Sequence, residues 1–441
     1  MTRPRRDLGR PGVGPYNGRR MFERTYLPDG PRVITARLSG ARSVAAAVYV
    51  LAGSRAETDD DAGAAHFMEH LTFRGTAGYP SSQAISEAVE GIGGSFNAAT
   101  DRESTVYWAK VPRRETRRAI EVLSDLVVRP LLRDGDIAGE RDIIVEEIRS
   151  YRDDPSDLVS TLFDLAIFGE TPLGREIAGD EGSVRRLAAA TLHDFWSRSY
   201  RPAHCVVALA GDVDHRAVVD LVAGAFGTGN GVRPGFSAPP SLPSRQRVRR
   251  AERDTAQAHF CVGVPALRRD HPDSWALEIM NTVLGEGMSS RLFLIVREQL
   301  GLAYDVSPIL NAYADCGIFG VCAGVDPDDL PPALDAVLAQ LARLRDEPVA
   351  AHELDKAKAF AGGRLELRLE ETHHLAAWVG VQEALHDEVL DLDEALQRIA
   401  SVTSEHIREL AGRLLTDDGL ALAVVAPAGA GLGLEERLHL P

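Results

Sequence analysis

The chain has little cysteine, and its cysteines are not spaced like a metal-binding or redox motif. Its 441 residues contain four, Cys205, Cys261, Cys316 and Cys322, with no CxxC pair. CxxC pairs are typical of structural zinc sites and thiol redox sites, whereas dense cysteine is typical of small domains held by disulfides. The sequence therefore favours buried or free thiols over a disulfide framework.

Long apolar runs and an excess of positive charge are also missing. No run is long enough for a membrane-spanning helix, and residues 1–24 contain no apolar core of signal-peptide length. The formal net charge is −16, which argues against nucleic-acid binding because such surfaces are basic. This charge serves solubility or attracts basic substrates. We therefore expect a cytoplasmic protein that binds neither nucleic acid nor membrane.

The most informative stretch that is present is His66-Phe67-Met68-Glu69-His70. Two histidines four apart on a helix project from one face, so both can reach one metal ion, and Glu69 lies near that face. HxxEH reverses the HExxH order of common zinc hydrolases and is the inverzincin signature. We expect the helix to begin near Asp59–Asp61, whose negative charges suit a helix N-terminus, and to stop by Gly75.

A catalytic zinc held by two imidazoles needs an acidic ligand from elsewhere and a position for water. The helix predicted over 136–151 offers candidates. Glu140 and Glu147 lie seven residues apart on one face, whereas Glu146 points roughly 100° away. Composition alone leaves two interpretations open: these carboxylates stay exposed on the helix flank, or they meet a cation.

The second half of the chain repeats the first in outline. A glycine-rich stretch at 91–100 leads into a strand at 104–111, which suits either a plain hairpin or a sheet edge that a peptide backbone can approach. Residues 310–324 resemble that stretch. The helix predicted over 273–283, where HxxEH would recur, has no histidine. The sequence therefore predicts a duplication in which only the first copy keeps metal ligands.

HxxEH followed by Glu147 resembles the pitrilysin (M16) family of zinc peptidases, most closely its mitochondrial-processing-peptidase-like (M16B) branch. Three further stretches agree: 94–100 with Glu103 and Thr105, then 288–293, and 297–304. The resemblance extends over about residues 24 to 430. Five motifs in the family's order make a coincidence very improbable.

The resemblance assigns the metal-binding half of a site. It implies that His66, His70 and Glu147 bind Zn²⁺ and that Glu69 is the general base. Glu140 would be a nearby carboxylate that orients a ligand histidine.

The resemblance also assigns residues that contact the substrate. The backbone of Phe96, Asn97 and Ala98 would hold an extended peptide, and Arg297 and Tyr304 would reach the substrate carbonyl from the second half. The alternatives are that Arg297 forms a surface ion pair and that Tyr304 belongs to the core.

The implied fold class is α+β, with two homologous α/β-sandwich domains. Each is a mostly antiparallel sheet flanked by helices, as in the LuxS/MPP-like metallohydrolase fold. We expect a flexible N-terminal arm at 1–23, a zinc-binding peptidase domain at 24–226, a linker at 227–245 and a second homologous domain at 246–441. Glycine and proline concentrate in that linker.

The expected function is a zinc-dependent endopeptidase that hydrolyses short or unfolded, extended peptides through a metal-activated water. Because the chain carries both halves of the site, a homodimer is favoured over a heterodimer with a related subunit. Asp153, Asp154 and Asp157 could favour basic residues near the cleaved bond, or they could be ordinary helix-terminal charges. The alternatives are a non-catalytic scaffold or partner subunit, and a protease dedicated to leader peptides.

Overall fold

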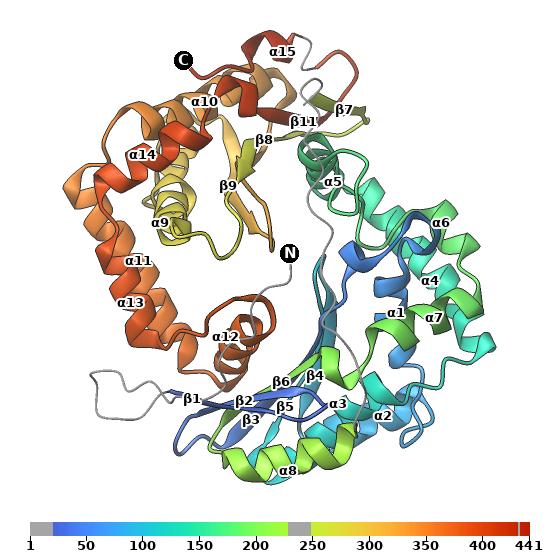
Figure 1. Cartoon of the computed structure of the whole chain (residues 1–441). Helices are drawn as coiled ribbons and strands as arrows, with labels where there is room; N and C mark the ends of the chain where they lie inside the picture. Colours follow the sequence, from blue (N-terminus) through green and yellow to red (C-terminus); the bar gives the residue numbers. More distant parts are fainter. Residues whose placement is uncertain (1–20, 228–247, 431–432) are drawn as a thin grey trace, which may run out of the picture.

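The computed structural model describes residues 21–227, 248–430 and 433–441, which form two lobes that each contain one sheet (Figure 1). We call the described residues up to 227 the first lobe and those from 248 onward the second lobe. The arm predicted at 1–23 and the linker predicted at 227–245 lie almost entirely outside the described residues. Phe22 and Glu23, which the prediction places in the arm, belong to strand β1 (Phe22–Tyr26).

The first sheet has six strands in the order β1-β2-β6-β3-β5-β4. In chain order these are β1 (Phe22–Tyr26), β2 (Arg32–Arg37), β3 (Ser43–Val50), β4 (Ser95–Thr100), β5 (Thr105–Pro112) and β6 (Cys205–Gly211). The central strands β3 and β6 are buried along almost their whole length, because both faces of the sheet are covered. Strand β4 forms one edge.

The second sheet has five strands in the order β7-β11-β8-β10-β9. These are β7 (Val248–Glu252), β8 (Ala258–Ala266), β9 (Ala303–Ala312), β10 (Gly317–Val325) and β11 (Ala421–Ala426). Each sheet contains one parallel pair, β2 with β6 and β7 with β11, and the remaining pairs are antiparallel. This matching order confirms the predicted fold of two sheet-plus-helix units.

The helices cover the faces of the two sheets. Those of the first lobe are α1 (Ala64–Thr72), α2 (Ser82–Glu90), α3 (Thr116–Val128), α4 (Asp134–Asp153), α5 (Pro155–Phe168), α6 (Glu181–Arg186), α7 (Ala189–Ser199) and α8 (His215–Phe226). Those of the second are α9 (Ser274–Gly285), the π-helix η5 (Leu292–Gln299), α10 (Leu330–Asp346), α11 (Ala351–Leu369), α12 (Thr372–Leu385), α13 (Leu392–Ser401), α14 (Ser404–Leu414) and α15 (Leu434–Arg437). In the described ranges, none is both long enough and apolar enough to cross a bilayer.

Each lobe places one helix on the sheet of the other lobe (Figure 1). Helix α5 of the first lobe packs on β8 and β11, where Val159 and Phe163 are buried. Helix α12 of the second lobe packs on β3 and β6, where Leu375 and Val379 are buried. Burial of apolar surface on both sheets therefore holds the lobes together, in addition to the chain connection.

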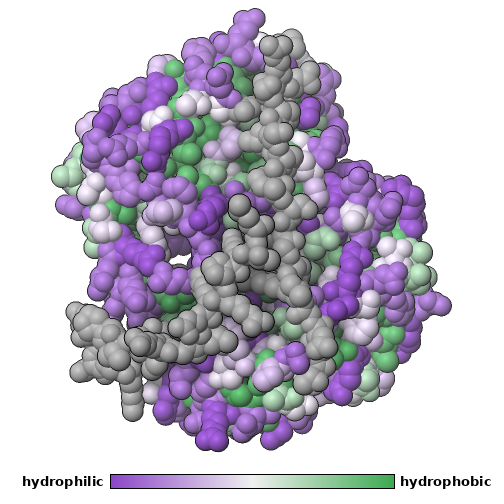
Figure 2. Space-filling view, in the orientation of Figure 1, coloured by the Kyte–Doolittle hydropathy of each residue, from purple (hydrophilic) through white to green (hydrophobic). Residues whose placement is uncertain are grey.

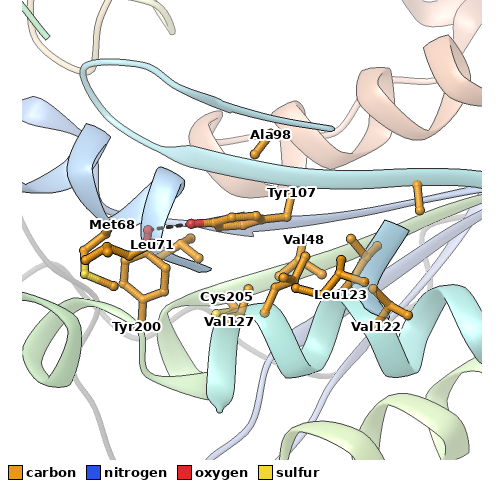
Figure 3. Packing of buried hydrophobic residues seen from close by; sticks show 14 of the residues in the cluster. Val48, Met68, Leu71, Ala98, Tyr107, Val122, Leu123, Val127, Tyr200 and Cys205 are labelled. Carbon is orange, nitrogen blue, oxygen red and sulfur yellow. Dashed lines mark hydrogen bonds between the residues drawn. The ribbon is translucent and has the colours of Figure 1, made fainter. Parts of the chain in front are cut away.

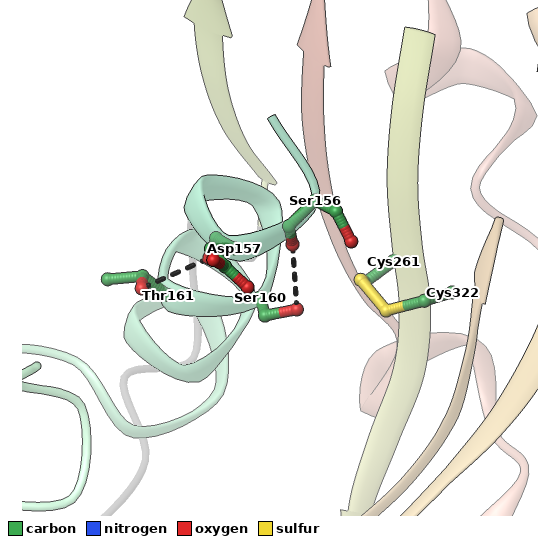
Figure 4. The surroundings of a disulfide bond; sticks show 6 residues. All are labelled: Ser156, Asp157, Ser160, Thr161, Cys261 and Cys322. Atoms are coloured by element: carbon green, nitrogen blue, oxygen red, sulfur yellow. Dashed lines mark hydrogen bonds between the residues drawn. A yellow bond between two sulfur atoms is a disulfide. The ribbon is translucent and has the colours of Figure 1, made fainter. Parts of the chain in front are cut away.

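The structure corrects the expectation that no cysteine is paired. Cys261 and Cys322 form a disulfide; they lie opposite each other in β8 and β10, with Cα atoms 4.1 Å apart. Figure 4 shows this bond beside α5, at the level of Ser156 and Ser160. Cys205 and Cys316 are free thiols, as expected. The pairing depends on strand register, which cysteine spacing does not reveal.

Candidate metal centre

Helix α1 has one face in the core and another that carries the HxxEH side chains. Met68 and Leu71 are buried, and Figure 3 shows them packed near Tyr107 and Tyr200, whose hydroxyl groups are 2.9 Å apart. The side chains at 66, 69 and 70 are only partly buried. The i, i+3, i+4 spacing therefore puts the apolar residues against the sheet and leaves the polar ones together on the other side.

The start of α1 differs from the prediction. Asp59–Asp61 form a separate 3₁₀ turn, and the carboxylate at the helix N-terminus is the buried Glu57. It accepts hydrogen bonds from the backbone N–H groups of Gly63 at 2.9 Å and Ala65 at 2.7 Å. Burial raises the pKa of Glu57 to about 8, against the opposing effect of these two hydrogen bonds. Its hydrogen-bond partners are specified only by the fold, so no sequence pattern singles out Glu57.

Glu147 of α4 completes a group of three possible metal ligands. Its Oε2 lies 3.4 Å from His70 Nε2, and its Oε1 lies 3.8 Å from His66 Nε2. Over the described part of the chain, these three residues form the one group of His, Cys, Asp or Glu whose ligand atoms all lie within 4.8 Å of one another. Ligand atoms around a tetrahedral zinc lie roughly 3.4 Å apart. We call His66, His70 and Glu147 the metal triad.

Two members of the metal triad are held in the protonation states that metal binding requires. Burial, followed by the nearby His70, lowers the pKa of His66 to about 4, so its imidazole is neutral at neutral pH. The hydrogen bond with His70 is the largest cause that lowers the pKa of Glu147 to about 2. The Tyr151 hydroxyl adds to this by donating to Glu147 Oε1 at 2.6 Å. Neutral imidazoles and a carboxylate suit a divalent transition metal.

Glu69 connects α1 to the edge strand β4. The hydroxyl of Thr100, the last residue of β4, donates to Glu69 Oε2 at 2.6 Å. Burial raises the pKa of Glu69, while the bond from Thr100 opposes the shift. A carboxylate beside the metal triad with a raised pKa is suited to accept and return a proton. Thr100 is a further residue that sequence reasoning did not assign.

Strand β4 carries the residues expected to hold a substrate. Phe96, Asn97 and Ala98 pair with β5 on one side, and no described strand pairs with β4 on the other. An edge strand of this kind can accept an extended peptide through its free backbone groups. The structure therefore provides the required edge, and the substrate role of these residues stays a prediction.

Glu140 lies beside His70, on the side away from Glu147. Its Oε2 is 3.0 Å from His70 Nδ1, and it also forms an ion pair with Arg74. Glu140 is only 2% exposed. A hydrogen bond from Nδ1 to this carboxylate fixes the imidazole tautomer and directs Nε2 toward the rest of the metal triad.

We predict that Glu140→Gln weakens zinc binding by about 10- to 100-fold without removing a ligand, because such orienting carboxylates have effects of that size. The zinc dissociation constant, measured by competition with a chelating dye, checks this. If the folded variant binds zinc with an unchanged dissociation constant, Glu140 does not orient His70, and its role is limited to the ion pair with Arg74.

Arg297 and Tyr304 lie together in the second lobe, on η5 and at the start of β9. The Arg297 guanidinium is 5.4 Å from the ring centre of Tyr304 and 5.0 Å from that of Phe293. Tyr304 is 77% exposed, which excludes a core role. Arg297 also lies 3.9 Å from Glu298, as the surface-pair alternative expects. Among the described residues, the structure shows no hydrogen bond or ion pair that joins Arg297 or Tyr304 to the metal triad.

Two other groups of polar side chains have structural roles. Asp154 caps α5 by accepting the N–H of Ser156 at 2.8 Å, which supports the reading of a helix-terminal charge. His373 packs on the ring of Trp108 at 4.3 Å, and His374 pairs with Glu371 at 2.9 Å. His373 is therefore half-buried at the contact between the lobes.

Comparison with known proteins places this geometry in a family. Residues 32–181 match the model described as "Insulinase (Peptidase family M16)", and residues 186–360 match "Peptidase M16 inactive domain". An uncharacterized zinc protease of Streptomyces coelicolor is 38% identical, with 89% of this chain and 87% of that protein covered. One from Mycobacterium leprae is 35% identical, with 95% and 94% covered.

The solved structures agree in fold. A protease from Helicobacter pylori superposes with a TM-score of 0.86 at 22% identity, covering 92% of this chain and 99% of the other. The two family models match most of the chain. Relatives named zinc proteases are also similar to it over most of its length. These two results are sufficient to assign the chain to a family. The chain belongs to the M16 peptidase family.

Proposed function

We propose that this protein is a zinc-dependent endopeptidase that hydrolyses short or unfolded peptides bound in an extended conformation. The observation that carries the proposal is the convergence of the metal triad from α1 and α4, with Glu69 beside it. Relatives named zinc proteases support the choice of metal. A zinc ion held there would supply a Lewis acid and lower the pKa of a bound water to about 7.

The chain's own residues supply the proton transfers and the substrate contacts. Glu69 would accept the proton of the attacking water and return it to the leaving amine. The free edge of β4 would bind the peptide backbone, which demands an extended substrate and tolerates varied side chains. Arg297 and Tyr304 would donate hydrogen bonds to the carbonyl oxygen as negative charge develops on it.

One part of the chain matches a model described as an inactive domain, which agrees with metal binding by the first lobe alone. That match covers residues 186–360, which include no member of the metal triad, whereas all three lie within the match at 32–181. The presence of all three ligands and Glu69 disfavours a non-catalytic scaffold. We further propose a homodimer of the M16B type, and we keep leader-peptide processing as a narrower version of the same activity.

The proposal predicts metal-dependent cleavage. The purified chain should cleave an internally quenched peptide with no stable fold, lose at least about 100-fold of that activity after removal of metal by a chelator, and regain it with one equivalent of zinc. A folded version of the same cleavage sequence should resist. Cleavage that persists after complete removal of metal would contradict the proposal.

A further inference from the structure

Two arginine–carboxylate pairs, each with one buried member, run between the lobes in opposite directions. Glu103 of the first lobe accepts hydrogen bonds from Arg269 Nη2 of the second lobe at 2.5 Å and from the Ala314 N–H at 3.0 Å. Arg55 Nη2 of the first lobe donates to Asp315 Oδ2 of the second at 2.5 Å. Arg55 Nη1 also donates to Glu103 Oε1 at 2.7 Å, which joins the two pairs. We call Arg55, Glu103, Arg269 and Asp315 the lobe-crossing cluster.

The cluster draws on matching positions of the two repeated units. Glu103 lies in the turn between β4 and β5, and Asp315 lies in the turn between β9 and β10, the strand pairs that hold the same places in their sheets. Arg55 and Arg269 follow the corresponding strands β3 and β8. Each unit therefore contributes one arginine and one acid, and each arginine reaches the acid of the other unit.

Two of the four members of the lobe-crossing cluster are buried, and the other two are partly buried. Glu103 is 1% exposed and Arg55 is 8% exposed. The two positive charges balance the two negative charges, but the loss of any one leaves a partner buried without its counter-charge. Glu103 has the most donors, since both arginines and a backbone N–H of the second lobe converge on its two oxygens.

The cluster lies at one end of each edge strand. In the first lobe, Glu103 follows Thr100, which ends β4 and contacts Glu69. In the second lobe, Arg269 Nη2 donates to the carbonyl of Ala312, the last residue of β9, at 3.1 Å, and Tyr304 lies near the other end of that strand. A change in the cluster would therefore alter the angle between the strand beside Glu69 and the strand that carries Tyr304.

Arg269 also fixes the helix that the second lobe places on the first. Its Nη1 donates to the carbonyl of Leu385, the last residue of α12, at 3.3 Å. The C-terminal carbonyls of a helix favour a positive partner. One arginine thus connects Glu103, the end of β9 and the end of α12.

We propose that Glu103 is a positioning residue that sets the orientation of the two lobes, so that Arg297 and Tyr304 are held opposite the metal triad. Its effect on catalysis rests on the proposed function, whereas its effect on lobe orientation does not. The apolar contacts of α5 and α12 hold the lobes together, and directional hydrogen bonds at Glu103 fix the angle between them.

The test compares Glu103→Gln and Arg269→Gln with the wild type. We expect each variant to bind one zinc as the wild type does, because neither side chain contacts the metal triad. We expect kcat to fall on the order of 100-fold with a smaller change in KM, since displacement of catalytic groups by about 1 Å has effects of that size. Small-angle X-ray scattering should show a profile that differs from that of the wild type, because the angle between the lobes is no longer fixed by these hydrogen bonds.

Glu353→Gln is the matched control. Glu353, like Glu103, is a carboxylate paired with arginine: Arg291 donates two hydrogen bonds of 2.8 Å to it, but both residues lie within the second lobe. Its substitution should leave the scattering profile and kcat near those of the wild type.

Three outcomes would overturn the proposal: unchanged kcat and scattering in Glu103→Gln, a fall in kcat that follows loss of zinc, or a scattering change of equal size in the control. If Glu103→Gln does not fold, Arg269→Gln decides by the same criteria, because it removes one charged donor from the second lobe and leaves Glu103 with Arg55 and the Ala314 N–H. A wild type without peptidase activity would contradict the proposed function, while the scattering comparison would still test the lobe coupling.

Discussion

Replacement of Glu69 by glutamine is expected to reduce peptide cleavage by about 100- to 10,000-fold while zinc stays bound, because general acid–base catalysis contributes rate factors of that size. Glutamine keeps the shape of the side chain and an oxygen that can still accept the Thr100 hydroxyl. It cannot take a proton from water at neutral pH. The measurements are kcat/KM on an unfolded peptide and the zinc content of the same preparation.

The Glu69 result is informative only if the site is otherwise intact. Burial raises the pKa of Glu69, so a neutral amide there removes a partly buried charge and is not expected to lower the melting temperature. A variant that keeps zinc and the wild-type rate would remove Glu69 from the mechanism. Loss of zinc together with activity would show instead that Glu69 acts through the metal site.

The second large effect is expected from Glu147→Gln, which removes the only carboxylate of the metal triad. Zinc affinity should fall by more than about 100-fold, because the loss of an orienting partner alone has effects of up to that size. Cleavage at substoichiometric zinc should fall with it. The amide oxygen is a poor ligand by comparison, and the His70 imidazole would lose its negatively charged neighbour.

Glu146→Gln is the matched control for Glu147, since it makes the same chemical change one residue earlier on α4. The Glu146 side chain is 71% exposed and pairs with Arg149 on the helix surface. The Glu146→Gln variant should keep the zinc affinity and activity of the wild type. Equal effects at 146 and 147 would contradict the assignment of Glu147 as a ligand.

The local part of the site could be predicted from sequence because helix geometry specifies it. Residues four apart share a helix face, so His66 and His70 had to lie together, and Glu147 was separated from Glu146 by the same argument. That these residues meet across α1 and α4 was implied by the family resemblance. The structure brings all three together.

The contacts that sequence reasoning missed are made between distant segments. Glu57 was overlooked because its partners are backbone N–H groups, which any sequence supplies. The disulfide of Cys261 and Cys322 required the register of β8 and β10. The exchange of α5 and α12 could not be foreseen because an apolar helix face does not specify which sheet it covers.

The residues proposed for catalysis are divided between the two lobes. The metal triad lies in the first lobe and Arg297 with Tyr304 in the second, so catalysis would require a fixed relation between the lobes. Within the described residues, the two exchanged helices and the lobe-crossing cluster connect the lobes. Figure 2 shows that the exterior on the viewed side is largely hydrophilic, with smaller hydrophobic areas among it.

X-ray absorption at the zinc edge of the loaded protein tests the central claim most directly. We predict one zinc per chain with two imidazole nitrogens and carboxylate and water oxygens, all at about 2.0–2.2 Å. Each of the variants His66→Ala and His70→Ala should lose one imidazole, so the imidazole signal in the spectrum should weaken in both. Sulfur ligands at about 2.3 Å, or failure of the folded wild type to bind zinc, would contradict the account.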